Sequence, residues 1–194
     1  MPKIKLGMKN CLYPNPIILA GATINGKPSY TTVSYCAIAN REPAMMAVSL
    51  NKLHYITAGI NKSNRFSINI PPVDILEKTD YCGLISGRNM DKSNLFKTFY
   101  GVLEDVPMVE ECPINMELKV IHSIELEGTN QFIIGRVIES YCEEKYMTHH
   151  HPDLKKINPI LLSLDDSNYY NVGEVIGKAW SAGKRLMDSN QRPK

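Results

Sequence analysis

Six polar side chains that can donate hydrogen bonds lie within nine residues of each other: Ser49, Asn51, Lys52, His54, Tyr55 and Thr57. An apolar run over 44–50 ends inside this group and a short helical segment follows, so the group spans a strand end and the first turn of a helix. The leading N–H groups of a helix have no intrahelical partner, and the positive end of the helix dipole attracts anions. The spacing therefore predicts an anion site, although Ser, Thr and Asn also cap helices for purely structural reasons.

A second candidate for anion binding is Lys92. It falls in the first turn of a helix that the apolar spacing predicts over Asp91–Phe99. A cation is unfavourable at this end of a helix. Lys92 is therefore either held there by an anion or is an ordinary exposed lysine.

Nucleophilic and metal-dependent chemistry have weaker support in the sequence. The chain has five cysteines, which are widely spaced and form no C-x-x-C pair: Cys11, Cys36, Cys82, Cys112 and Cys142. We expect free thiols in a reducing cytosol, and Cys36 and Cys82 fit small buried residues better than nucleophiles. The run His149–His151 precedes Pro152, and adjacent residues project in different directions, so we expect a loop near the pocket or a dimer seam and no metal site. No G-x-G-x-x-G or P-loop motif is present.

Composition indicates one globular domain. The chain has 194 residues, 43% of them apolar, which is enough to bury a core without disulfides or metal. Its net charge is +2 and no basic block occurs, so we expect a small ligand and no nucleic-acid partner. No stretch has the character of a signal peptide or of a membrane helix. We expect no membrane partner and a cytoplasmic location, with one domain over residues 1–190 and a disordered tail over 191–194.

The apolar pattern predicts a mostly β fold with short helices. Short strands are expected at Ile17–Ala22, before the hairpin signal Asn25-Gly26, and at Tyr30–Ala37, Ala44–Leu50 and Phe66–Ile70. A short helix is expected over Val73–Tyr81. Seven alternate positions then define one face of a long strand: Ile114, Met116, Leu118, Val120, His122, Ile124 and Leu126. A second long strand, Gln131–Cys142, pairs with it through a hairpin loop. Helices are too few to cover both faces of an open sheet, so we expect a barrel, with His122 a hydrogen-bonded core or rim residue.

Several motifs together resemble the flavin reductase-like, FMN-binding split-barrel family, most closely its flavoredoxin branch. They are Tyr-Pro-x-Pro at Tyr13–Pro16, Thr-Val-Ser-Tyr at Thr32–Tyr35, Pro-x-Met-x-x-x-Ser-Leu at Pro43–Leu50, Tyr-x-Thr at Tyr55–Thr57, Phe-x-x-Asn-Ile at Phe66–Ile70, and Asp-Tyr-Cys-Gly-x-x-Ser-Gly-Arg at Asp80–Arg88, followed by Asp91-Lys92. The resemblance covers nearly the whole chain. It implies a Greek-key antiparallel split barrel, FMN as cofactor and a homodimer with flavin at the subunit seam.

The resemblance also implies which residues hold FMN. The backbone of Thr32, Val33, Ser34 and Tyr35 is expected to face the isoalloxazine ring. The phosphate is expected at Ser49, Leu50, Asn51, Lys52, His54, Tyr55 and Thr57, with Lys92 reaching the phosphate or the ring. The cofactor would be bordered by Asn69, Cys82, Gly83, Ser86 and Gly87, and Tyr170 or the His149–His151 loop could come from the neighbouring subunit.

Because FMN carries the redox chemistry itself, no catalytic side chain is expected. Three functions remain open. The protein could be an oxidoreductase that passes electrons from NADH or NADPH through FMN to a flavin or another acceptor. It could be an electron carrier that exchanges electrons with a redox protein, without a nicotinamide step. It could also be a split barrel without redox turnover, which binds flavin as a sensor or binds nothing.

Overall fold

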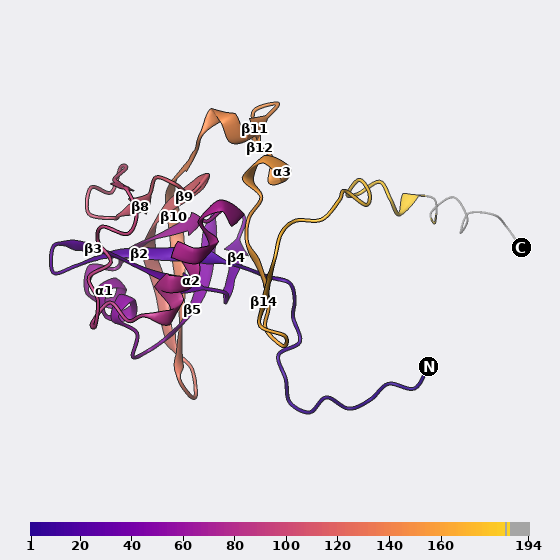
Figure 1. Ribbon diagram of the computed structural model, residues 1–194, viewed down its shortest axis with the longest axis horizontal. Coiled ribbons are helices and arrows are strands. Elements are labelled where there is room, and N and C mark those ends of the chain that lie inside the picture. Colours follow the sequence, from indigo (N-terminus) through magenta and orange to yellow (C-terminus); the bar gives the residue numbers. More distant parts are fainter. Residues whose placement is uncertain (185, 187–194) are drawn as a thin grey trace, which may run out of the picture.

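Seven strands form one antiparallel sheet whose two edge strands are consecutive in the chain. Across the sheet the order is β3 (Lys27–Val33), β2 (Ile18–Ile24), β6 (Arg65–Ile70), β9 (Ile114–Glu125), β10 (Asn130–Cys142), β5 (Met45–Asn51) and β4 (Cys36–Asn40). Only Ser34 and Tyr35 separate β3 from β4, so the two edges must lie close together and the sheet curls into a barrel (Figure 1). The computed structural model describes residues 1–184 and 186. Within them no ladder joins β3 to β4, so the barrel is split along this line.

Shorter elements surround the barrel. β1 (Asn15–Pro16), β13 (Leu161–Ser163) and β14 (Asn168–Tyr170) form a small sheet, β7 (Thr98–Phe99) pairs with β8 (Met108–Val109), and β11 (Met147–Thr148) pairs with β12 (His151–Pro152). The helices are α1 (Tyr55–Ser63), α2 (Leu76–Leu84) and α3 (Leu154–Ile157), with 3-10 turns at η1 (Val73–Ile75) and η2 (Glu144–Tyr146). The predicted mostly β split barrel with short helices is confirmed. The predicted tail, 191–194, lies outside the described residues.

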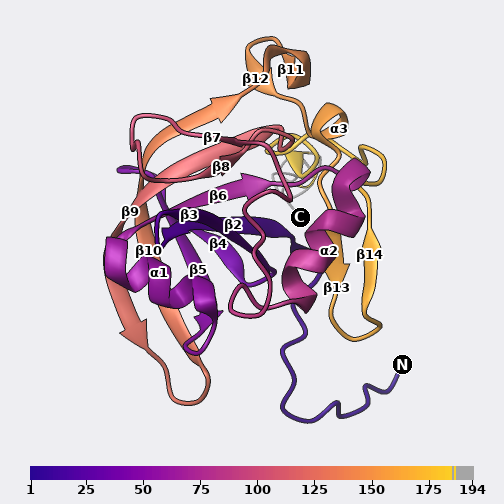
Figure 2. The same cartoon turned by 60° about the vertical axis from the view of Figure 1, so that its left-hand side comes forward.

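Local sequence explains where the main elements turn. In the β2–β3 hairpin Asn25 and Gly26 both have positive φ, 52° and 76°, as a tight hairpin turn requires. α1 ends at Asn64, which adopts the left-handed conformation and donates its N–H to the Ile60 carbonyl at 2.8 Å. α1 packs against β2 and β6, and α2 packs against β3 (Figure 2).

The barrel interior is filled by side chains from β2, β3, β5, β6, β9 and β10, together with two from α1. Ile18, Val48, Phe66, Leu118 and Ile133 are among its fully buried members, each 5% exposed or less. A second cluster between the sheet and α2 contains Leu19, Tyr30, Cys82, Phe96, Val109 and Cys112. The two clusters fix α1 and α2 on the same barrel.

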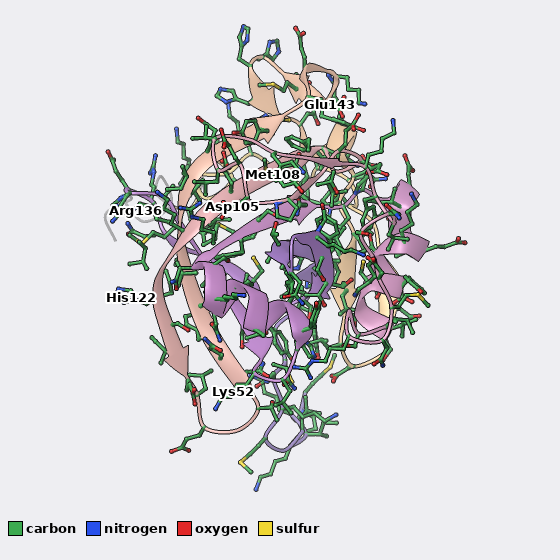
Figure 3. The ribbon with its side chains drawn as sticks, turned by 90° about the vertical axis from the view of Figure 1, so that its left-hand side faces the viewer. Lys52, Asp105, Met108, His122, Arg136 and Glu143 are labelled. Carbon is green, nitrogen blue, oxygen red and sulfur yellow. The ribbon has the colours of Figure 1, made fainter. Side chains whose placement is uncertain are left out.

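The predicted apolar face of β9 was wrong beyond Val120. Ile134 pairs with His122 but Gly135 pairs with Val120, so Ile121 is an extra residue, a β-bulge. One extra residue turns every following side chain to the opposite face. His122 is therefore exposed on the outside of the barrel, as Figure 3 shows, and is not a core residue.

The predicted helix over Asp91–Phe99 is also wrong. This segment forms turns and then enters β7. The Asp91 carboxylate accepts the N–H of Ser93 at 2.9 Å and the ammonium of Lys27 at 2.7 Å. A short acidic side chain that bonds the backbone two residues ahead favours a turn over a helix.

Candidate functional site

A cavity of about 210 Å³ lies between the first turn of α1, the end of α2 and β3. It is lined by Ser29, Tyr30, Thr31, Leu53, His54, Tyr55, Ile56, Cys82, Gly83, Leu84, Ile85, Ser86, Gly87 and Lys92. We call it the helix cavity. A Cβ on Gly87 would lie 2.6 Å from Cδ1 of Tyr55, so this close approach of the loop to the tyrosine ring requires glycine.

A second cavity, of about 230 Å³, opens where the barrel is split. Its lining residues come from the β3–β4 link, the end of β5 and the β9–β10 hairpin: Thr32, Val33, Ser34, Tyr35, Ser49, Leu50, Asn51, His54 and Asn130. We call it the split cavity. His54 lines both cavities, so the two lie next to each other at this residue.

The helix cavity presents several hydrogen-bond donors that have no acceptor. His54 is the N-cap of α1 and makes no side-chain cap bond. Among the residues that the structure describes, the backbone N–H groups of Tyr55 and Ile56 and the hydroxyl group of Ser29 have no hydrogen-bond partner. Ser29 is 7% exposed and lines the cavity. Such donors at a helix N-terminus favour an anion.

Lys92 contributes a cation to the same cavity. The residue is 5% exposed, and its ammonium group donates to the carbonyls of Cys82 at 3.0 Å and Ile85 at 2.8 Å. An ammonium group has three donors, so one remains for a ligand. Burial lowers the pKa of Lys92. A charged amine placed here would be stabilised by an anion in the cavity.

His54, Cys36 and Cys82 are held neutral. Burial, and then the charge of Lys92, lower the pKa of His54, so its ring is neutral at pH 7. Burial raises the pKa of Cys36 and of Cys82 to about 11. Neither cysteine is therefore an activated thiolate.

Most of the predicted site residues lie together. The predicted members along Thr32–Tyr35 and at Ser49, Leu50 and Asn51 line the split cavity. The predicted members Tyr55, Cys82, Gly83, Ser86, Gly87 and Lys92 line the helix cavity. The two groups come from segments up to 60 residues apart in the sequence, Thr32 to Lys92.

Three predicted residues lie elsewhere. The Lys52 ammonium donates to the Leu126 carbonyl at 3.0 Å, at the end of the β9–β10 hairpin (Figure 3). Thr57 is fully buried and donates to the Asn51 carbonyl at 2.9 Å. Asn69 is also fully buried, and it ties β6 to β2 and β8 through the Leu19 carbonyl and the Val109 N–H. These three side chains support the walls of the site and line neither cavity.

Ser29 and Asn130 are lining residues that sequence reasoning missed. Asn130 donates to the Ser49 hydroxyl at 3.0 Å and pairs with Asn51 across β10 and β5. The signal that could have found it is the pairing of these two strands. The sequence shows both strands but not which one lies beside the other.

In the His149–His151 run, His149 and His150 form the turn of the β11–β12 hairpin and have positive φ, and His151 begins β12. Within the described part of the chain, no group of three or more His, Cys, Asp or Glu side chains could hold a metal ion. No helix in that part is long and apolar enough to cross a membrane.

Comparison with known proteins identifies the family. Residues 8–161 match the model of the flavin reductase like domain. The flavoredoxin from Methanosarcina acetivorans is 41% identical, with a TM-score of 0.93 over 96% of this chain and 100% of that one. Flavoredoxin of Desulfovibrio vulgaris (Miyazaki F) is 33% identical, with a TM-score of 0.86 over 94% and 100% of the two chains. An FMN-binding protein from Thermus thermophilus shares the fold, at 20% identity and a TM-score of 0.76 over 92% and 98%. The chain therefore belongs to the flavin reductase-like family and is similar in sequence and structure to these two flavoredoxins.

Proposed function

We propose that this protein binds FMN in the two joined cavities and transfers electrons through it, from NADH or NADPH to a flavin or another acceptor. The observation that carries the proposal is the set of unpaired donors at the start of α1, next to Lys92. These donors match a phosphate group, and the adjoining split cavity offers room for the ring. FMN, when bound, supplies the redox chemistry.

The residues of the two cavities would have different roles in binding FMN. The N–H groups of Tyr55 and Ile56, the Ser29 hydroxyl and the third donor of Lys92 would bind the phosphate. The Thr32–Tyr35 segment, with Ser49 and Asn51, would border the ring. We therefore assign Ser49 and Asn51 to the ring end of the site, whereas the sequence pattern predicted them at the phosphate end. Neutral His54, between the two, would orient the ligand without adding charge.

We propose further that the protein is a homodimer. On the outside of the sheet, Ile124 pairs with Phe132, and Ile134 pairs with Ala47, which in turn pairs with Ala37. Directly paired residues share a face. This outer face is largely apolar and lies next to the split cavity, and Ile124 on it is 49% exposed. An uncovered apolar face on a barrel is typical of a subunit interface.

An anaerobic experiment tests the function. Purified protein is titrated with FMN, and the complex is mixed with NADH or NADPH while flavin absorbance is recorded. Bleaching supports the reductase. A cofactor that only dithionite or a reduced redox protein bleaches would favour the alternative function, an electron carrier. Protein that fails to bind FMN in equilibrium dialysis would contradict the proposal.

The dimer is tested by sedimentation with and without Ile124→Asp. The aspartate would place a charge in the interface, so the variant should be monomeric at concentrations where the parent protein is dimeric. Lys62→Asp, on the exposed side of α1, is the matched control for a new carboxylate away from this face. A parent protein that is monomeric while saturated with FMN would refute a shared seam.

A further inference from the structure

A cavity of about 810 Å³ lies at the opposite end of β10 from the split cavity. Its walls come from β7, the start of β9, the end of β10 and η2. We call it the aromatic cavity. β10 runs from Asn130, which lines the split cavity, to Ser140, which lines this one, a span of about 30 Å. A ligand of the split and helix cavities therefore leaves the aromatic cavity free.

Three half-buried aromatic side chains form its apolar walls: Phe99, Tyr141 and Tyr146. The rings of Phe99 and Tyr141 meet edge to face, with centroids 5.9 Å apart, and the Tyr141 hydroxyl donates to Glu117 at 2.6 Å. Rings that are already held in place can receive a ligand without a further loss of side-chain freedom. Aromatic residues of this kind are enriched at protein interfaces, where they receive large apolar side chains. The aromatic cavity therefore suits a segment of protein.

The rim of the aromatic cavity has more carboxylates than ammonium groups. Three carboxylates line it against two ammonium groups: Glu110, Glu111 and Glu143 against Lys97 and Lys145. Lys145 pairs with Glu143 at 2.7 Å. Within the described residues, the side chains of Glu110 and Lys97 form no ion pair and no hydrogen bond. A positively charged segment is therefore a better match for this rim than a negatively charged one.

The C-terminal arm, residues 171–184, has the complementary character. Figure 1 shows that it leaves β14 and runs away from the barrel. Val175, Ile176 and Trp180 are 79% exposed or more, so none of the three packs on its own chain. Glu174 pairs with Lys155 at 3.0 Å, and the charged residues that follow it in the arm are Lys178 and Lys184. The arm thus carries uncovered apolar side chains together with positive charge.

We propose that in the homodimer the C-terminal arm of each copy places Trp180 in the aromatic cavity of the other copy. The inference rests on the homodimer of the proposed function and is independent of the flavin. A second copy is the occupant that the molecule itself provides, because one chain carries both the arm and the cavity. In a two-fold dimer such a pair of surfaces is used twice. The stretch from Asn171 to Trp180 spans about 30 Å when extended, which is enough to cross from one barrel to its neighbour.

Tryptophan fluorescence tests the inference, because Trp180 is the only tryptophan in the sequence. Emission spectra of the full-length protein, saturated with FMN, are recorded over a range of protein concentrations. In the dimer the emission maximum should lie at the short wavelength of a buried indole, and it should move to longer wavelength as dilution produces the monomer. Ile124→Asp, designed to be monomeric, should emit at the longer wavelength throughout. In sedimentation, Trp180→Ala should weaken the dimer about 30-fold or more, as expected for a hot-spot side chain.

A variant of the cavity shows where the arm binds. Tyr146→Asp places a carboxylate in the wall that the indole would contact, and burying that charge is unfavourable. The hydroxyl of Tyr146 has no hydrogen-bond partner within the described residues, so the variant should fold. Its Trp180 should emit at the longer wavelength. Tyr100→Asp is the matched control, because Tyr100 is 46% exposed and lies outside the lining of the cavity.

Mixed dimers distinguish the two copies. Trp180→Phe has an intact aromatic cavity and contains no tryptophan. When it is added in excess to Tyr146→Asp, the remaining tryptophan can enter the intact cavity of the other copy. The short-wavelength emission should therefore return. If the arm folded onto its own chain instead, the added variant would have no effect.

The outcomes separate this inference from the proposed function. A dimer in which Trp180 emits as an exposed indole overturns the inference and leaves the homodimer intact, as does a Tyr146→Asp spectrum equal to that of the parent protein. Short-wavelength emission from the Ile124→Asp monomer, or no recovery in the mixed dimers, would place the arm on its own chain and also overturn it. A protein that is monomeric at every concentration would remove the homodimer as well.

Discussion

Replacing Lys92 by methionine separates its two roles in the structure. Its ammonium group holds the carbonyls of Cys82 and Ile85 at the end of α2, and one donor remains for the ligand. Methionine keeps the length and the apolar stem but removes the charge and all three donors. We expect the variant to bind FMN more weakly and to be less stable, while its affinity for riboflavin is nearly unchanged.

The magnitudes follow from the contacts. A hydrogen bond to a charged group contributes about 1.5–3 kcal/mol, which corresponds to a loss of FMN affinity of about 10- to 150-fold. Riboflavin has no phosphate, so its affinity should change by less than about twofold. The two abandoned carbonyls should cost about 1–3 kcal/mol of folding stability, and each kcal/mol lowers Tm by about 2–4 °C in a chain of this size.

Two measurements on the same preparations check this prediction. Flavin fluorescence quenching, recorded at a temperature well below Tm, gives the dissociation constants of FMN and riboflavin. Thermal unfolding without flavin gives the stability. Lys62→Met, an exposed lysine in the last turn of α1, is the matched control and should leave all three quantities unchanged. Equal losses of FMN and riboflavin affinity would refute a contact between Lys92 and the phosphate.

Three further perturbations test other parts of the structure. Glu117 is fully buried and accepts the Tyr141 hydroxyl at 2.6 Å, so Tyr141→Phe should lower the unfolding free energy by about 1.5–3 kcal/mol in denaturant titration; an unchanged midpoint would contradict this. Because the pKa of His54 is lowered, the folded protein binds fewer protons than the unfolded chain between that lowered pKa and the ordinary value, and stability falls as the pH drops through this window. His54→Gln should make the fall in stability smaller. A pH profile of stability identical to that of the parent protein would contradict this prediction. Exposed Cys11 should react with a thiol reagent at once, and buried Cys82, with its pKa of about 11, should react only after unfolding. Peptide mass mapping of the labelled native protein measures both rates, and equal rates for the two cysteines would contradict this prediction.

The strands and their turns were predictable because each depends on local sequence. The Asn25-Gly26 turn and the alternation at the start of β9 both appear in the structure. The β9 bulge was not predictable. Ile121 differs from its neighbours in no way that marks it as an extra residue, and the bulge becomes visible only when β10 is aligned beside β9.

The anion signal was predictable in part for the same reason. The start of α1 is local, so its free N–H groups could be expected from residues 49–57. The other donors of the site come from β3 and from the loop after α2, and their proximity is a result of tertiary packing. Lys92 shows the difference. It lines the helix cavity, although the helix from which its role was predicted does not exist. It lies beside the helix cavity since its ammonium group binds the end of α2.

The position of the site follows from the one place where the sheet does not close. In a closed barrel every strand pairs on both sides, and packed side chains fill the interior. Here the chain passes from one edge to the other through Ser34 and Tyr35. Within the described residues, only the Tyr35 carbonyl of this link has a backbone partner, the Ser49 N–H at 2.9 Å. The backbone along this link therefore keeps polar groups that can bond a ring with several donors and acceptors. Because α1 begins at the same end of β5, the unpaired strand edge and the unpaired helix N-terminus meet at His54. One elongated ligand with a polar ring and an anionic tail can satisfy both.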